Sequence, residues 1–236
     1  MLVDDRSRLA EIPLFAGVDP LVVGEIANLF SVRDYAAGSE IVRHLEDDTD
    51  VYFVLAGRVK VRIYSCQGRI VAFRQIECGE IFGEYAALDG TPRSASVEAE
   101  IDTRVAVLSA ADFNAIVAGH SSIAQALIQQ LVKQIRDLTV RYSELSTLAV
   151  NGRIEAELLR IARHDGQTVQ AEPNKILIKT PPTQYELANR VSTHREAISR
   201  HLSHLSRIGL IRRTRHALVI EDMQRLQEMV QRSGAD

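Results

Sequence analysis

The chain has 236 residues, enough for one large or two modest domains with a sizeable core. It contains no apolar run of the ~18 residues that a membrane span needs, and its charged N-terminus, MLVDDRSRLAEI, lacks the apolar core of a signal peptide. We therefore expect a cytoplasmic protein with no membrane partner. Residues 1–150 carry 14 Lys and Arg against 21 Asp and Glu, whereas residues 151–236 carry 14 against 10. The basic C-terminal part favours a polyanionic partner.

The two cysteines, Cys66 and Cys78, are too few for a disulfide framework or a four-cysteine cluster. A bridge between them is one alternative, and free thiols in a reducing compartment are the other, which we favour. The sequence has no H-E-x-x-H, no C-x-x-C and no G-x-x-x-x-G-K-[ST]. It therefore predicts neither a conventional metal site nor a P-loop.

Short strands are predicted from Val32 to Leu108. Residues 51–65, VYFVLAGRVKVRIYS, are rich in β-branched and aromatic side chains and are interrupted by Gly57. GRIVAFRQI follows a Gln-Gly turn, and residues 94–109, SASVEAEIDTRVAVLS, supply two more strands. Turn residues recur roughly every 8–12 positions, which predicts a β-sandwich or roll flanked by short helical pieces. Ser109-Ala-Ala-Asp112 resembles a capping box and is expected to start a helix.

The segment GEIFGEYAALDGTPRSASV (79–97) carries the chemistry of an anion site. The guanidinium of Arg93 is suited to a phosphate diester because its rigid fork donates two charge-assisted hydrogen bonds. Backbone N–H groups at residues 93–95 offer a nest for the same anion, and the Glu84 carboxylate can accept from a ribose 2′-hydroxyl. The alternative is a β-turn with a surface Arg–Glu pair. F-G-E-x-A followed by P-R-S-A-S-V is too specific for that alternative.

Residues 120–150 predict one long helix without proline or interior glycine. Its apolar side chains recur every seven residues in two offset series, which are Ala124, Leu131, Leu138 and Leu145, and Ile128, Ile135, Tyr142 and Ala149. One alternative is a helix that packs on its own domain. A seam between two helices fits the four heptads better, and a parallel homodimer is its natural product. Asn151-Gly152 is expected to interrupt the helix, with a domain boundary near residues 150–153.

The C-terminal part predicts a winged helix-turn-helix. RIEAELLRIARHDG restarts a helix, and KILIK (175–179) follows as a strand. A helix from about Thr183 to Arg190, a tight turn and a second helix lead into LIRRTRHALVI (210–220), a basic β-hairpin. The predicted fold class is therefore α+β, with a β-roll over residues 1–119, a dimerisation helix over 120–150 and a winged helix-turn-helix over 151–236.

The second helix of that motif, within STHREAISRHLSHLSRIG (192–209), has two distinct faces. Its apolar side chains are Ile198, Leu202 and Leu205, and its polar ones are Arg195, Glu196, Ser199, Arg200 and Ser203. The polar face has a structural interpretation as a solvated surface, on which Glu196 and Arg200 can pair and Glu196 fits a capping box with Thr193. It also has a functional one, because arginine reads guanine and glutamate accepts from cytosine in the major groove. Seven arginines against two glutamates over residues 182–215 favour the functional one.

R-E-x-x-x-R in a C-terminal helix-turn-helix, after a long helix and a β-roll, resembles the cAMP receptor protein (catabolite activator, Crp/Fnr) family of bacterial transcription regulators. The resemblance covers essentially the whole chain. It implies that Arg195 and Glu196 read the G and C of a TGTGA half-site, and that Arg200 reads its other G. His194 stands where the best-known member has a small phosphate-contacting residue, and it is itself a candidate phosphate contact. Arg213, in the wing, is expected to contact the DNA backbone.

Residues 79–97 likewise resemble the cyclic-nucleotide phosphate-binding cassette. The resemblance implies that Gly83 and Glu84 hold the ribose, and that Arg93 and Ser94 hold the cyclic phosphate. The family's base-contacting Thr-Ser pair falls on Leu138 and Thr139, so one hydroxyl is kept. Ser94 is also compatible with a syn guanine, which keeps cGMP as a second ligand beside cAMP. Iron–sulfur and haem relatives are excluded, because no cysteine precedes residue 66 and His44 alone is a poor haem match.

The expected function is that of a homodimeric, cAMP-dependent transcription regulator that binds TGTGA-type palindromes and is not an enzyme. RNA polymerase is an expected partner, because the loop His164–Asn174 matches a place where family members touch it. One alternative is a nucleotide-sensing regulatory subunit of an enzyme, against which the R-E-x-x-x-R helix argues. Another is a cyclic-nucleotide phosphodiesterase, for which the sequence has no metal constellation and no paired acid and base.

Overall fold

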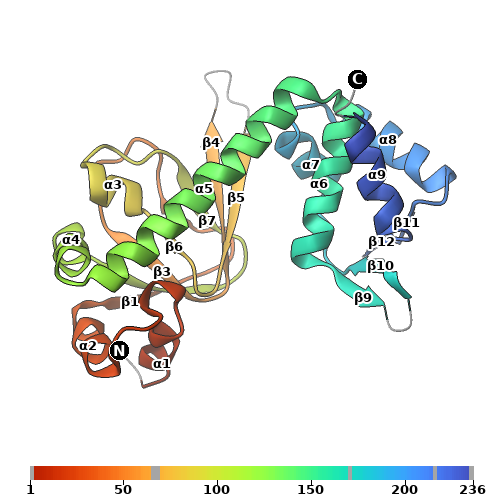
Figure 1. Cartoon of the computed structure of the whole chain (residues 1–236). Coiled ribbons are helices and arrows are strands. Elements are labelled where there is room, and N and C mark those ends of the chain that lie inside the picture. The colour runs from red at the N-terminus through yellow and green to blue at the C-terminus, as the bar shows by residue number, and fades with distance from the viewer. Residues whose placement is uncertain (1–2, 65–69, 170–171, 215–216, 234–236) are drawn as a thin grey trace. The chain divides into compact units, whose positions relative to one another are not determined.

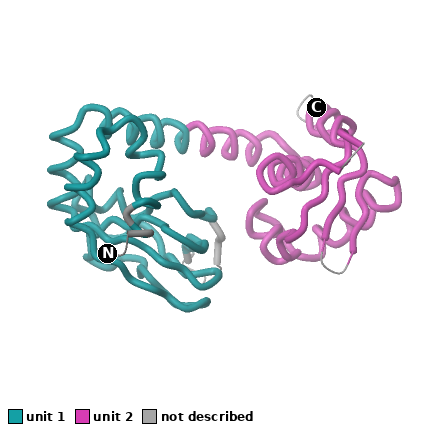
Figure 2. Tube along the Cα trace, turned by 90° about the horizontal axis from the view of Figure 1, so that it is seen from below, with its two compact units in different colours: residues 1–135 teal, residues 136–236 magenta. Residues whose placement is uncertain are grey.

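The computed structural model describes residues 3–64, 70–169, 172–214 and 217–233. The chain divides into two compact units, Met1–Ile135 and Arg136–Asp236, and the division falls within one long helix, α5 (Ser121–Thr147) (Figure 2). The first unit is built on β-sheets and the second on helices with a small sheet (Figure 1), so the predicted α+β class is confirmed. Among the described residues, no helix has the length and apolar content to cross a membrane.

The first unit is the predicted β-roll with helices before and after it. In chain order its elements are α1 (Val3–Ala10), η1 (Pro13–Phe15), α2 (Pro20–Ile26), η2 (Ala27–Leu29), β1 (Ser31–Tyr35), β2 (Glu40–Val42), β3 (Val51–Ala56), β4 (Arg58–Tyr64), β5 (Ile70–Glu77), β6 (Ile81–Phe82), α3 (Glu84–Asp89), β7 (Ser96–Ala99), β8 (Thr103–Leu108), α4 (Ala110–Gly119) and the first part of α5. Gly57 separates β3 from β4 as predicted. Ser109 caps α4 by accepting from the N–H of Asp112 at 3.1 Å, which confirms that start signal.

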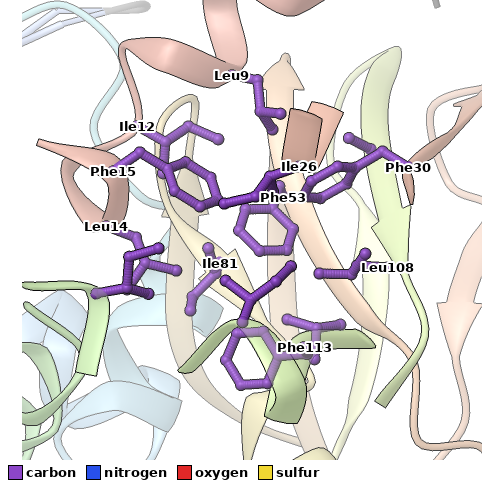
Figure 3. Close-up of a cluster of buried hydrophobic side chains, with 14 of the residues drawn as sticks. Leu9, Ile12, Leu14, Phe15, Ile26, Phe30, Phe53, Ile81, Leu108 and Phe113 are labelled. Atoms are coloured by element: carbon purple, nitrogen blue, oxygen red, sulfur yellow. The ribbon is translucent and has the colours of Figure 1, made fainter. Parts of the chain in front are cut away.

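Within the described residues the strands of this unit form two antiparallel four-stranded sheets, ordered β1-β8-β3-β6 and β2-β7-β4-β5. Strand β3 is buried on both faces, which explains its nearly continuous apolar sequence. Phe53 and Leu55 point into a core shared with the helices, where Phe53 packs against Phe15 and Phe30 (Figure 3). Tyr52 and Val54 point into a second core between the two sheets. The Tyr52 face leads to the candidate ligand site.

The first part of helix α5 packs on the first unit through one narrow face. Ile123 and Leu127 are buried in the first core. The expected interruption at Asn151-Gly152 is wrong, because α5 ends at Thr147 and α6 (Val150–Asp165) begins with Ala149 as its N-cap. Asn151 and Gly152 lie inside the first turn of α6 instead.

The second unit contains the predicted helix-turn-helix and wing. Its elements after the end of α5 are α6, β9 (Gln167–Val169), β10 (Glu172–Ile178), α7 (Gln184–Arg190), α8 (Arg195–Arg207), β11 (Ile211–Arg213), β12 (Leu218–Ile220) and α9 (Met223–Ser233). The strands pair in the order β11-β12-β10-β9. The predicted apolar face of α8, formed by Ile198, Leu202 and Leu205, is buried in the core of this unit. That burial leaves the polar face of α8 exposed.

Helix α9 was not anticipated from the sequence, and it explains Gly152. Leu226 of α9 is fully buried in the core of the second unit. A Cβ added at Gly152 would lie only 2.8 Å from the Cβ of Ser233, the last residue of α9. Glycine at this position therefore allows α9 to pack closely on α6, and it does not mark a break in the helix.

Candidate functional site

The predicted phosphate cassette contains a short helix that begins at its second glycine. Gly83 is the N-cap of α3 and has a φ of 87°, in the left-handed region that favours glycine. A Cβ at Gly83 would lie 2.6 Å from Nη1 of Arg93 and 2.7 Å from the carbonyl oxygen of Asp50. Glycine therefore lets these segments close on each other. The fold brings three of the predicted ligand residues, Gly83, Glu84 and Arg93, into one place.

Arg93 is almost completely buried, with an exposed fraction of 2%. Its Nη1 donates to the carbonyl oxygen of Gly83 at 2.9 Å, and its Nη2 donates to the carbonyl oxygen of Asp50 at 2.6 Å. Nη2 also donates to the carboxylate of Asp48. The guanidinium carbon lies 5.6 Å from the centre of the Tyr52 ring, in cation–π range. Sequence reasoning missed these partners, although the acidic run EDDTD (46–50) just before a buried strand was a signal.

The Asp48 carboxylate is held by three donors. Besides Arg93, it accepts from the Tyr52 hydroxyl at 3.2 Å and from the N–H of Asp50 at 3.1 Å. Burial alone would raise the pKa of Asp48, but the hydrogen bonds from Arg93, from the Asp50 N–H and from Tyr52 lower it overall. The pKa of Tyr52 is raised, first by burial and then by the charge of Asp48, so its hydroxyl remains a donor.

Glu84 opens α3 and is 5% exposed. Burial raises the pKa of its carboxyl, and its own backbone N–H and the charge of Arg74 only partly oppose this rise. The next residue, Tyr85, donates from its hydroxyl to Gln134 of α5, which ties α3 to the long helix. Ser94 is exposed beside Arg93. The site thus combines a buried cation, a buried carboxyl group and an exposed hydroxyl.

The helix-turn-helix is assembled by local contacts around α7 and α8. Thr183 caps α7, and its side chain and that of Glu186 form a reciprocal capping box. After α7, Ser192 adopts a φ of 52°, and the N–H of Thr193 donates to the carbonyl oxygen of Ala188 at 2.9 Å. This contact closes the tight turn that the sequence predicted.

The predicted capping box of Thr193 and Glu196 is wrong. The N-cap of α8 is His194, and its side chain makes no capping hydrogen bond. Thr193 belongs to the turn, because its backbone N–H already bonds to α7. The predicted pair of Glu196 and Arg200 is also not formed among the described residues. Neither of these two local contacts is therefore formed, and the polar face of α8 is exposed to solvent.

The candidate DNA-contacting side chains lie at the exposed surface of the second unit. Those exposed are His194, Arg195, Glu196, Arg200, Ser203 and Arg213, and Ser199 is half-buried. In the wing, the neighbouring Arg212 donates to Glu221 at 2.7 Å, and Glu221 also pairs with Lys175. Two arginines and a glutamate therefore lie on the exposed face of α8, within its first two turns, and a β-wing follows the helix. A major-groove reader would need side chains of these types in such a place.

Two family models match separate stretches of the chain. Residues 32–120 match the cyclic nucleotide-binding domain, and residues 152–229 match the Crp-like helix-turn-helix domain. The chain belongs to the Crp/Fnr family of DNA-binding transcription regulators. The predicted family is therefore confirmed, and it is a family of transcription factors and not of enzymes.

This Crp/Fnr regulator resembles relatives along nearly its whole length. It is 24% identical over 218 residues to the CRP-like cAMP-activated global transcriptional regulator of Mycobacterium tuberculosis, covering 92% of this chain and 96% of the relative. It is 27% identical to the Thermus thermophilus catabolite activator protein, with a TM-score of 0.54 over 92% of this chain and 98% of that one. The c-di-GMP responsive regulator CLP of Xanthomonas campestris shares the fold at 21% identity, with a TM-score of 0.73 over 86% and 99%. Relatives named for different nucleotides share this fold, so the fold alone does not identify the ligand.

Two predicted ligand residues of the regulator, Leu138 and Thr139, lie on α5 beyond residue 135 and so belong to the second unit. Both are exposed in the single chain. Cys66 lies outside the described residues. Cys78 is exposed, and its thiol donates to the carbonyl oxygen of Leu55 at 3.1 Å. Among the described residues, no group of three or more His, Cys, Asp or Glu side chains is arranged to hold a metal ion.

Buried charges join the helices of the DNA-binding unit, and sequence reasoning missed them. The Glu157 side chain of α6 is 1% exposed and accepts from Arg160 and from Arg190, the latter at 3.2 Å. Arg190 ends α7, so this carboxylate links α6 to the first helix of the motif. On the inner face of α8, His201 Nε2 lies 2.9 Å from Oε1 of Glu155, also of α6. These contacts position the two helices of the motif.

Proposed function

We propose that this regulator is a homodimer whose binding to DNA is activated by a cyclic nucleotide, cAMP. In this proposal residues 1–119 bind the nucleotide, residues 120–150 dimerise and residues 151–236 bind DNA. The observation that carries the proposal is the packing of the buried Arg93 guanidinium against the glycine-capped start of α3, next to the buried Glu84. The name of the M. tuberculosis relative, a cAMP-activated regulator, points to the same ligand.

Each predicted residue has a role in this proposal. Gly83 and Glu84 hold the ribose, while Arg93 and Ser94 hold the cyclic phosphate. Thr139 supplies one hydroxyl to the base. Leu138 stands at the position of the family's second base-contacting hydroxyl, which this chain lacks. Because one neutral hydrogen bond is worth ~1 kcal/mol net, we expect cGMP to bind with comparable affinity and to activate DNA binding less than cAMP does.

The dimer is proposed to form through the exposed apolar side of α5. Its large side chains that remain exposed in the single chain at heptad positions are Ile128, Ile135, Leu138, Tyr142 and Leu145. Leu131 shares this series and also packs partly against the core of its own unit. Such a row of apolar groups is costly in water, and a second copy of the same helix would cover it.

DNA readout is assigned to the exposed face of α8. Arg195 and Arg200 read guanines and Glu196 reads a cytosine of a TGTGA half-site, while Ser199 allows close approach to the bases. His194 and Arg213 contact phosphates. The two recognition helices of a dimer would enter successive major grooves about 34 Å apart. The nucleotide promotes this DNA-binding arrangement only if its affinity for that arrangement is higher than its affinity for the alternative arrangement of the dimer.

A mobility-shift titration tests this proposal. The full-length protein is titrated onto a TGTGA palindrome and onto a duplex of equal length with scrambled half-sites, with cAMP, with cGMP and without ligand. We expect tight binding only to the palindrome with cAMP, and weaker binding with cGMP. Binding that ignores the nucleotide, or that is equal on both duplexes, contradicts the proposal. RNA polymerase is the proposed further partner, through residues 164–174. The structure corrects the expected loop here, because this segment includes the end of α6, strand β9 and the start of β10. The polymerase can be added to the preformed complex.

A further inference from the structure

The guanidinium assigned to the ligand phosphate already holds an anion of the protein itself. Nη2 of Arg93 donates to Oδ2 of Asp48, and the Tyr52 hydroxyl donates to the same oxygen at 3.2 Å. The N–H of Asp50 donates to the other oxygen, Oδ1, at 3.1 Å. One cation and two neutral donors that converge on a monoanion form the kind of donor set that binds a phosphate diester. Asp48 therefore occupies an anion-binding position.

We propose that the Asp48 carboxylate is an internal competitor of the ligand phosphate at Arg93, so that a nucleotide binds only after this carboxylate has moved away. The inference rests on the proposed function, in which a cyclic nucleotide binds at Arg93. Asp48 would set the nucleotide concentration at which the regulator responds. A ligand that binds only to a minor state has an apparent dissociation constant equal to the intrinsic one divided by the population of that state.

Arg93 is held by its backbone as well as its side chain, whereas Asp48 is held at this site by its carboxylate. The backbone of Arg93 is held on both sides, since its N–H donates to the carbonyl oxygen of Glu46 and its carbonyl oxygen accepts from the N–H of Leu45, both at 2.9 Å. The Asp48 side chain is 33% exposed, against 3% for Arg93, and lies in the irregular segment between β2 and β3. Rotation of this one partly exposed side chain would therefore uncover the guanidinium while the backbone contacts of Arg93 stay in place.

The Arg93 side chain would also stay in position after Asp48 leaves. The carbonyl oxygens of Gly83 and Asp50 still hold the two terminal nitrogens of Arg93, at 2.9 and 2.6 Å. Its Nε is buried and has no hydrogen-bond partner among the described residues. A phosphate with several acceptor oxygens can satisfy more of these donors than one carboxylate oxygen does. Exchange of the carboxylate for a phosphate would therefore keep the contacts of Arg93 with Gly83 and Asp50.

Neutralising Asp48 tests the inference. Calorimetric titration of the full-length protein with cAMP compares wild type with Asp48→Asn and with Asp47→Asn, a matched change of the adjacent exposed carboxylate. If the open state is populated at roughly 10% or less, Asp48→Asn should bind cAMP about tenfold more tightly or better. Asp47→Asn should stay within about twofold of wild type, because general charge changes little at this distance. Asp48→Ser serves as a second variant and should act in the same direction.

Two results overturn the inference, namely unchanged or weaker cAMP binding by both Asp48 variants, or an equal gain in Asp47→Asn. A second probe, inorganic phosphate, separates this inference from the identity of the ligand. Phosphate should raise the melting temperature of Asp48→Asn more than that of wild type or Asp47→Asn, and Arg93→Gln in the Asp48→Asn background should abolish the difference. If neither wild type nor any variant binds cAMP or cGMP, the proposed function fails. The melting experiments with phosphate then still test whether Asp48 competes with an anion at Arg93. An equal phosphate response in wild type and Asp48→Asn then overturns the inference.

Discussion

Replacing Ile128 by glutamate should separate the proposed dimer into monomers. Five side chains at heptad positions of α5, Ile128, Ile135, Leu138, Tyr142 and Leu145, are between 41% and 73% exposed in the single chain. Complete burial of one such side chain contributes ~1.5–3 kcal/mol. Scaled by the exposed fractions, the five side chains of both protomers together contribute roughly 8–17 kcal/mol to association before its entropic cost. Ile128 is 60% exposed, and its loss from both protomers removes about 2–4 kcal/mol of that burial.

The new carboxylates add to this loss. Each protomer would bury an unpaired charge in the seam, which costs at least ~1–3 kcal/mol per group. Together these effects exceed about 4 kcal/mol, so the dimer dissociation constant should rise by roughly a thousandfold or more. Sedimentation equilibrium over a range of protein concentrations measures this change directly.

Val140→Glu is the matched control for Ile128→Glu. Val140 lies on the same helix and is 53% exposed, but its position is on the side opposite the heptad series. We expect its dissociation constant to stay within about threefold of wild type. If Ile128→Glu forms a dimer as tight as that of wild type, or if both variants dissociate equally, the seam does not lie on this face.

Glu84→Gln should have a higher melting temperature than wild type at pH 8. Burial raises the pKa of Glu84, so wild type loses stability as the pH rises above about 4.3, whereas the glutamine variant does not. The difference in melting temperature should disappear below pH 4, and a pH-independent difference contradicts this reasoning. Glu157→Gln should lower the free energy of unfolding in urea by about 3 kcal/mol, since Arg160 and Arg190 lose a buried partner, whereas the exposed Glu228→Gln should change it little. Glu196→Ala should lose ~1–3 kcal/mol of discrimination at one C·G pair in mobility shifts, and equal tightening on all duplexes would show a charge effect alone.

Local patterns in the sequence were sufficient to predict most elements and both motifs. The β-branched and aromatic residues of 51–64 predict strands, and Gly57 separates them into β3 and β4. The apolar spacing of Ile198, Leu202 and Leu205 predicts which face of α8 is buried, and so leaves Arg195, Glu196 and Arg200 outside. The cassette of residues 79–97 likewise brings Gly83 and Arg93 together, because the two lie only ten residues apart in one contiguous segment.

Contacts between distant segments were decided only by the tertiary structure. Asn151-Gly152 has the composition of a turn, yet Gly152 lies within helix α6. Its missing Cβ makes room for Ser233 of α9, about 80 residues further along the chain. Thr193 was available as a helix cap, but its N–H is taken by the carbonyl oxygen of Ala188, and the N-cap moves to His194. The sequence motif around Arg93 is the same whether or not an acidic side chain of the protein pairs with its guanidinium. Its pairing with Asp48 arises because β3 and the cassette pack side by side, and a sequence pattern gives no register for segments 45 residues apart.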